Sequence, residues 1–234
     1  MRRSLLSLSV FALVAGVIGT PSASAQQQSV NFFVGGFSPR GLDGRGSHDV
    51  TFQNLDFSTF DPNDFNGATI GGEWLVGLGE NLDAGFGASF YQRTSPAVFT
   101  DFVNPDNSDI EFDQKLRMVP ITATIRFLPL GHHSPVRPYI GGGVSVISWR
   151  YTESGAFVDF SNHNNIFRDT FTANGAKAAP VVLGGVTFPI GNVGVGGEIR
   201  WQGGKADLPA PDWPAGTTVN LGGMNYLFMI NVRF

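Results

Sequence analysis

The end of the chain constrains its fold more than any other stretch. From Met224 onward every second residue is large and apolar, whereas Asn225, Asn231 and Arg233 stand among the residues between them. A period of two is typical of a strand whose two faces meet different surroundings. The apolar face closes on an aromatic residue, Phe234, where a soluble domain usually frays into water. A bilayer is crossed by roughly 9–11 tilted strand residues with aromatic residues at its edges, so we interpret this segment as the last strand of a membrane barrel.

The first residues of the chain have the features of a secretion signal. Two arginines precede an apolar run at 5–18, and small residues at 23–25 form a cleavage pattern. We therefore expect 1–25 to be removed as a signal peptide and 26–234 to form one outer-membrane barrel domain. Because no cysteine follows the signal, a lipid-anchored N-terminus is excluded.

Charge and composition exclude several classes of protein. Without the two N-terminal arginines the chain has 13 basic and 19 acidic residues, a net charge of −6, which argues against nucleic acid as a partner. The absence of cysteine removes any disulfide framework. Charged residues make up 15% of the chain, below the ~25% of an average soluble domain. No mature segment has the ~18 uninterrupted apolar residues of a helical span, so a sheet with one lipid-facing side is favoured.

Seven further segments are expected to be strands. The clearest is a hairpin, in which 69–78 and 82–93 flank a turn of Gly79, Glu80 and Asn81. The others are 30–37, a segment that ends at Phe127, 137–151, 176–188 and 193–202. The apolar phase reverses near Met118–Pro120, and proline lacks a backbone donor, which together predict a β-bulge there.

The connections between these strands carry the stronger argument for a barrel. Polar stretches at 40–67, 94–109, 153–175 and 203–218 are expected to be long loops, although 50–60 alternates weakly and could extend a strand. The connections are long, short, long, medium, long, short and long in order. Successive antiparallel connections alternate sides of the membrane, so all the long ones share one side, as in outer-membrane barrels. Closure follows because hydrocarbon offers no partner for a free strand edge.

The signal peptide, the eight strands and the terminal segment 226–234 together resemble the small outer-membrane barrels of the OmpA-like, OmpW-like and opacity-type group. The stretch 137–143 is also similar to the start of the fifth strand in that group. The resemblance implies an all-β fold, an eight-stranded antiparallel transmembrane β-barrel with an up-and-down meander. It also implies a monomer in the cell outer membrane of a Gram-negative-type bacterium, with no cofactor.

The partners implied by this resemblance are outer-membrane lipids, lipopolysaccharide and the barrel-assembly machinery, which engages the C-terminal strand. In that strand the expected membrane-insertion signal is Tyr226, Phe228, Ile230, Val232 and Phe234. A small-molecule ligand is a further expected partner.

If the apolar faces meet lipid, the opposite faces line the lumen and carry charge. The residues expected there are Glu73, Asp83, Arg126, Glu198, Arg200 and Arg233. An eight-stranded barrel is only wide enough for side chains or one small ligand, and a buried charge must be paired. We therefore expect a structural ion-pair plug, with a polar path or binding site as the alternative.

Other polar residues offer weaker signals. No serine and histidine at strand ends have the spacing of a catalytic pair, so we expect no enzyme activity. His132 and His133 are neighbours that point apart in an extended segment, and His48 and His163 lie in different loops. We therefore expect no metal site at the histidines.

The first long loop carries five carboxylates, Asp43, Asp49, Asp56, Asp61 and Asp64. The run 61–67 fails as a calcium loop because Phe65 occupies a position that needs an oxygen ligand. We expect solvated acidic loops, with weak cation bridging to lipopolysaccharide as the alternative.

The aromatic residues fit the edges of a bilayer better than a ligand cage. We expect interfacial girdles to include Trp74, Trp149, Trp201, Tyr91, Tyr139 and Tyr226.

Three roles remain open from the sequence. By resemblance, the leading one is a structural or porin-like outer-membrane protein that binds or passes small, apolar molecules. The alternative is a surface adhesin or host-interaction protein that acts through its four long loops. A soluble lipocalin-like carrier is the third, and it would place apolar residues inside the barrel.

Overall fold

The computed structural model describes residues 27–41, 44–160, 165–209 and 217–234. The expected signal peptide at 1–25, Asp43 and His163 lie outside the described residues. Eight long antiparallel strands dominate the described part of the chain. They are β1 (Gln28–Pro39), β3 (Gly67–Gly77), β4 (Leu82–Val103), β5 (Asp109–Phe127), β6 (Arg137–Asp159), β7 (Asn165–Ile190), β8 (Val193–Gln202) and β11 (Gly223–Arg233).

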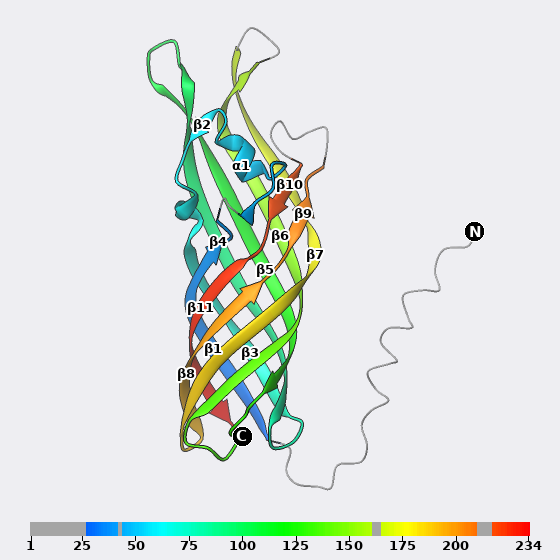
Figure 1. Ribbon diagram of the computed structural model, residues 1–234. Helices are drawn as coiled ribbons and strands as arrows, with labels where there is room; N and C mark the ends of the chain where they lie inside the picture. Colours follow the sequence, from blue (N-terminus) through cyan, green and yellow to red (C-terminus); the bar gives the residue numbers. More distant parts are fainter. Residues whose placement is uncertain (1–26, 42–43, 161–164, 210–216) are drawn as a thin grey trace, which may run out of the picture.

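These strands close into a barrel, which confirms the predicted fold class. Each pairs with its neighbours in the sequence, and the ring closes where β1 pairs with β11 along its length, for example Phe32 opposite Ile230. Figure 1 shows a tall barrel whose short turns gather at one end, close to the C-terminus. The turn between β7 and β8 has only two residues, and Gly191 adopts a φ of 64°, a conformation that such turns need and glycine supplies.

The lower part of the barrel has an apolar outer surface. Alternate side chains on every strand point outward there and are exposed, as Phe86, Phe228 and Ile199 illustrate. Other members of this outer apolar belt are Phe32, Val34, Ile70, Trp74, Phe90, Ile121, Ile125, Ile140, Val144, Val146, Val182, Phe188, Trp201, Tyr226 and Ile230. An exposed apolar surface that encircles a protein is stable only against an apolar medium.

Above the belt, β4 to β7 continue well past the other four strands (Figure 1). Most of the predicted loops at 94–109 and 153–175 are therefore wrong, since these residues extend the two hairpins. The predicted bulge at Met118–Pro120 is also wrong, because the register runs unchanged from Ala88 opposite Ile121 to Tyr91 opposite Met118. The register of this pair shifts instead between Val98 and Val103.

Shorter elements fold over the upper end of the barrel. The expected strand extension at 50–60 begins instead with the helix α1 (Val50–Asn54), and only the two residues of β2 (Ser58–Thr59) are strand. The remaining elements are η3 (Pro62–Phe65), β9 (Lys205–Asp207) and β10 (Thr218–Asn220). In the described part of the chain, no helix is both long and apolar enough to cross a membrane.

The upper interior is apolar, in contrast to the outer surface around it. One cluster fills the middle of the barrel and includes Val50 of α1, Leu116, Met118, Ile147 and Leu221. A second cluster lies between the extended hairpins and is rich in phenylalanine, among them Phe99, Phe112 and Phe157. Their rings contact one another, with centroids 5.3 to 5.5 Å apart. A third, smaller cluster lies inside the lower barrel and includes Phe33, Leu183, Leu227 and Met229. The outward side of the strands is thus apolar in the belt, whereas above it the inward side is the apolar one.

Candidate functional site

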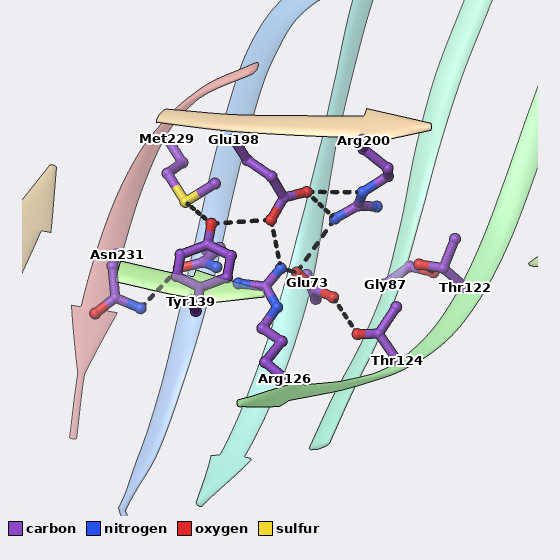
Figure 2. A network of polar contacts seen from close by, with 11 residues as sticks. Glu73, Gly87, Thr122, Thr124, Arg126, Tyr139, Glu198, Arg200, Met229 and Asn231 are labelled. Atoms are coloured by element: carbon purple, nitrogen blue, oxygen red, sulfur yellow. Dashed lines mark hydrogen bonds and ion pairs between the residues drawn. The ribbon is translucent and has the colours of Figure 1, made fainter. Parts of the chain in front are cut away.

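A layer of charged side chains lies inside the lower barrel, and Figure 2 shows its network of polar contacts. Glu73 comes from β3, Arg126 from β5, and Glu198 with Arg200 from β8. All four occupy inward positions of their strands, and each is at most 5% exposed. We refer to these four residues as the charge layer. It contains two carboxylates and two guanidinium groups, so its formal charge is zero.

The charge layer is fully connected. Arg126 donates from Nη2 to a carboxylate oxygen of Glu73 and to Oε2 of Glu198, the latter at 2.9 Å. Arg200 donates from Nε to Oε1 of Glu198 at 2.8 Å, and its Nη2 lies 3.5 Å from Oε2 of Glu73. Each of the two arginines therefore contacts both carboxylates. Such pairing offsets the large cost of removing charge from water.

Neutral side chains complete the layer. The hydroxyl of Tyr139 on β6 donates to Oε2 of Glu198 at 2.9 Å, and that of Thr124 donates to Oε1 of Glu73 at 3.0 Å. The guanidinium carbon of Arg126 also lies 4.6 Å from the centroid of the Tyr139 ring. Figure 2 shows these groups converging from opposite sides of the barrel.

Glycine provides the space that the layer needs. A Cβ on Gly85 of β4 would lie 2.6 Å from both Oε1 of Glu73 and Oγ1 of Thr124. Real Cβ atoms do not approach oxygen so closely, so any larger residue here would displace the carboxylate. The strand glycines are thus partly explained by packing against the layer.

A small polar cavity lies on the turn side of the charge layer. Its volume is about 40 Å³, and it is lined by Asp83, His132, Arg137 and Arg233 among others. Oδ1 of Asp83 lies 3.2 Å from Nε2 of His132. The cavity has room for a few water molecules rather than for a substrate.

The six residues predicted for the lumen are thus divided between three places. Glu73, Arg126, Glu198 and Arg200 meet in the charge layer. Asp83 lies next to His132 at the small cavity, and Arg233 donates at the rim to the carbonyl of Gly191 at 3.1 Å. Two members of the network, Tyr139 and Thr124, were missing from the prediction. Thr124 is the inward residue before Arg126 on β5, and Tyr139 is an inward residue of the next strand, β6.

Of the six aromatic residues expected in the girdles, three lie on the outer surface, where a girdle requires them, and three do not. Trp74, Trp201 and Tyr226 are exposed on the outer surface. In contrast, Tyr91, Tyr139 and Trp149 are buried inside the barrel. The sequence could not separate these two groups because glycines dilute the alternation around 139–149 and apolar residues face inward above the belt.

A second polar group lies above the belt, between the two apolar clusters. Asn54, the last residue of α1, donates from Nδ2 to Oε1 of Glu153 at 2.5 Å and to Oε1 of Gln114 at 3.0 Å. The hydroxyl of Tyr151 donates to the same two oxygens, each at 2.9 Å. Burial raises the pKa of the Glu153 carboxyl to about 7, against the lowering effect of the hydrogen bonds from Asn54 and Tyr151. We refer to these four residues as the loop latch, because they tie the first loop to β5 and β6.

The acidic residues of the first loop have structural roles where the structure describes them. Asp49 is buried rather than solvated, which corrects the prediction for this residue: it accepts from Thr51 N at the start of α1 and pairs with Arg45 at 2.9 Å. Asp61 caps η3 by accepting from Asn63 N at 2.8 Å. No group of three or more metal-ligating side chains is found among the described residues.

Comparisons with known proteins identify the fold. No family model matches the chain, and no curated protein matches it. Among solved structures, the outer membrane protein OprG of Pseudomonas aeruginosa is similar over 89% of this chain and 96% of its own, with 11% identity and a TM-score of 0.51. Neisserial surface protein A has 13% identity over 89% of this chain and 97% of its own, with a TM-score of 0.45.

The outer membrane protein AlkL has 14% identity over 92% of this chain and 95% of its own, with a TM-score of 0.43. The similarity to OprG, with its TM-score of 0.51, supports a shared fold, and at 11% identity it supports nothing beyond the fold. The chain thus has the fold of the small eight-stranded outer-membrane β-barrel proteins, the group that its sequence resembles.

Proposed function

We propose that this protein is an integral outer-membrane barrel with a closed interior, which holds a rigid extension above the outer surface of the cell. The apolar belt supports the membrane location, because an outer surface of this kind is stable in lipid. The proposal includes export by a cleaved signal peptide, insertion through the C-terminal strand and a monomeric state. The short turns then face the periplasm and the extended hairpins face outward.

The observation that carries the closed interior is the burial of the charge layer. In a water-filled pore the charged side chains of the lumen are hydrated, whereas Glu73, Arg126 and Glu198 are 2–3% exposed. Their hydrogen-bonding groups point at one another across the barrel. A layer of this kind supports a structural ion-pair plug over a polar path.

The upper half of the barrel adds a second barrier. Helix α1 and the β9–β10 hairpin contribute side chains to the apolar cluster above the charge layer, including Val50, Ala206 and Val219. A solute that entered from outside would have to displace this cluster and the loop latch. Both features favour a structural role over a porin-like one.

Single-channel recording in a planar bilayer tests the closed interior. We expect the purified protein to insert, as judged by heat-modifiable migration on a gel, and to show no discrete conductance steps. A general porin added afterwards to the same bilayer is the positive control. Stepwise conductance that scales with salt would instead establish a hydrated path and reject the closed interior.

A second candidate function is recognition of a partner by the extended hairpins. It is favoured by the length of these strands, because the segment 92–103 of β4, above the belt, is roughly 40 Å long at ~3.3 Å per residue. The phenylalanine cluster between the hairpins makes this extension rigid, which suits a recognition surface.

Shortening the β4–β5 hairpin at 99–112 tests this candidate. Loss of cell attachment to a host-cell or abiotic surface, with normal amounts of folded barrel, is the outcome expected for an adhesin. Unchanged attachment would leave the structural role as the better assignment.

A further inference from the structure

Two outward-facing arginines stand opposite each other on neighbouring strands. Arg117 of β5 and Arg150 of β6 are register partners, and both side chains are exposed. Directly opposed like charges destabilise a pair of strands. Such an arrangement therefore needs a compensating group.

The described part of the chain provides no carboxylate for this purpose. None of its ion pairs involves Arg117 or Arg150. The guanidinium carbon of Arg117 instead lies 5.5 Å from the centroid of the Phe90 ring. This contact steadies the guanidinium group but leaves its charge uncompensated.

The position of the two arginines along their strands is specific. The next outward residues toward the turns are Val119 and Ile121 on β5, and Ser148 and Val146 on β6. Arg117 and Arg150 are thus the first outward-facing charged residues above the apolar belt on β5 and β6. On the proposed membrane placement, they stand at the level of the lipid headgroups of the outer leaflet.

The surface around them is hollowed. A depression of about 400 Å³ lies over β5, β6 and β7, between side chains that are mostly hydrogen-bond donors or small. Its lining includes Arg117, Val119, Ser148, Arg150, Asn174 and Ala176. The two guanidinium groups, the Ser148 hydroxyl and the Asn174 amide are the hydrogen-bond donors that line this depression.

We propose that this depression binds a phosphate group of an outer-leaflet glycolipid. Two guanidinium forks match the geometry of phosphate oxygens, and such charge-assisted hydrogen bonds are among the strongest in proteins. The apolar side chains directly below, such as Val119 and Val146, provide a surface for the acyl chains of the same molecule. A free phosphate ion would use only the upper part of this surface, so a lipid is the better match. The inference rests on the proposed membrane location and assigns a specific binding site to the glycolipid that is expected there.

Lipid A titrations on the full mature protein in detergent test this site. We expect the double variant Arg117→Gln/Arg150→Gln to bind bis-phosphorylated lipid A at least tenfold more weakly, since tenfold corresponds to about 1.4 kcal/mol and a charged hydrogen bond contributes about 1.5–3 kcal/mol. Arg168→Gln/Lys205→Gln is the matched control, because it removes the same charge at exposed positions outside the depression. Its affinity should stay within twofold of the wild type. Arg117→Lys/Arg150→Lys keeps the charge but loses the forked geometry and should bind with intermediate affinity.

Two further ligands separate the phosphate from the rest of the lipid. Dephosphorylated lipid A should bind the wild type no better than bis-phosphorylated lipid A binds the glutamine variant. Inorganic phosphate should bind at least tenfold more weakly than the lipid; equal binding would overturn the assignment to a lipid. Equal binding of bis-phosphorylated lipid A to wild type and to the folded glutamine variant would reject the site.

The test is separable from the proposed function. Heat-modifiable migration and insertion into vesicles are measured on the same samples. Normal insertion with unchanged lipid binding would reject only the phosphate site, whereas failure of the wild type to insert would reject the membrane location itself.

Discussion

Asn54 and Glu153 join the first loop to the barrel wall. The Nδ2 of Asn54 donates to Oε1 of Glu153 at 2.5 Å, across 99 positions of the sequence and inside an otherwise apolar region. Both side chains are buried, and withdrawal of α1 would remove one of the two hydrogen bonds that Oε1 of Glu153 accepts, those from Asn54 and Tyr151. The protonation of Glu153 is therefore coupled to the position of helix α1.

This coupling predicts a pH-dependent loop. The pKa of Glu153 rises from an ordinary 4.5 to about 7 in the folded protein, so the folded state holds its proton more tightly than the open state. The stabilisation of the closed loop by protonated Glu153 is therefore complete below pH 4.5, and it is lost as the pH rises through about 7. This shift in pKa lowers the free energy of opening the loop by about 3 kcal/mol at pH 8 relative to pH 4.

Hydrogen exchange of the α1 amides, corrected for intrinsic rates, measures this effect. We expect protection to fall between pH 5 and pH 8 in the wild type and to change little in Glu153→Gln. Glu111→Gln is the control, since Glu111 is an exposed carboxylate on the outer side of β5, and it should behave as the wild type. A wild-type profile that is flat with pH would contradict the role of Glu153.

The charge layer makes a second prediction, about stability. Replacement of Arg126 with alanine would leave Glu73 and Glu198 to share Arg200, so two buried carboxylates would face one cation. We expect a loss of about 3–5 kcal/mol in the free energy of unfolding. Urea unfolding in phospholipid vesicles, followed by tryptophan fluorescence, measures it.

Two further variants make this result specific. Arg168→Ala removes an exposed arginine and should change stability by less than about 0.5 kcal/mol. Adding Glu73→Gln to Arg126→Ala should restore part of the lost free energy of unfolding. The double variant lacks both Arg126 and the carboxylate of Glu73, so only Glu198 and Arg200 remain charged and they can pair with each other. If Arg126→Ala and Arg168→Ala had equal effects, the layer would not be the structural plug proposed here.

Gly85 provides a third prediction, which concerns space rather than charge. Its added Cβ would lie 2.6 Å from oxygens of Glu73 and Thr124, so Gly85→Ala should destabilise the barrel by about 1–3 kcal/mol. Gly36→Ala is the matched control, as no atom lies within 4 Å of its added Cβ. The same unfolding experiment compares the two, and equal stability of both variants would show that the lumen adapts freely at this level.

Much of this architecture follows from the sequence, because alternation with a period of two records which medium each face meets. The eight strands and the outward positions of Phe86, Ile199 and Phe228 are examples. The inward direction of Glu73 and Arg126 follows from the same alternation. That these two side chains meet does not, because they come from β3 and β5, on either side of β4, and their approach depends on the stagger of the strands around the ring.

The wrong bulge and the wrong loops on β4 to β7 share one physical cause. Leu116 and Met118 are apolar in the phase opposite to Ile121, which the sequence analysis explained by a bulge. The strand is in fact regular, and the surroundings change instead. On the proposed membrane placement, lipid lies outside the belt, whereas above it water lies outside and an apolar cluster lies inside. The outward-facing residues of the upper hairpins are polar, so these segments have the composition of loops and were predicted as loops.

This reversal leads to a fourth prediction, which tests the proposed membrane location directly. The chain has no cysteine, so single cysteine variants can carry spin labels at chosen positions. Labels at Phe86, Phe228 and Ile199 should be accessible to oxygen and protected from a water-soluble nickel reagent. Labels at the outward positions 150 and 154 of β6 should show the opposite preference.

The change of accessibility along β6 should be abrupt. Val144 and Val146 are exposed and apolar, while Arg150 is the first outward charge above them, so the boundary of the hydrocarbon should fall between 146 and 150. A gradual change would indicate that the belt is not matched to a bilayer. Nickel accessibility at Phe86 or Phe228 equal to that at 154 would mean that water surrounds the whole barrel, and both the closed outer-membrane barrel and the lipid phosphate site would then lose their basis.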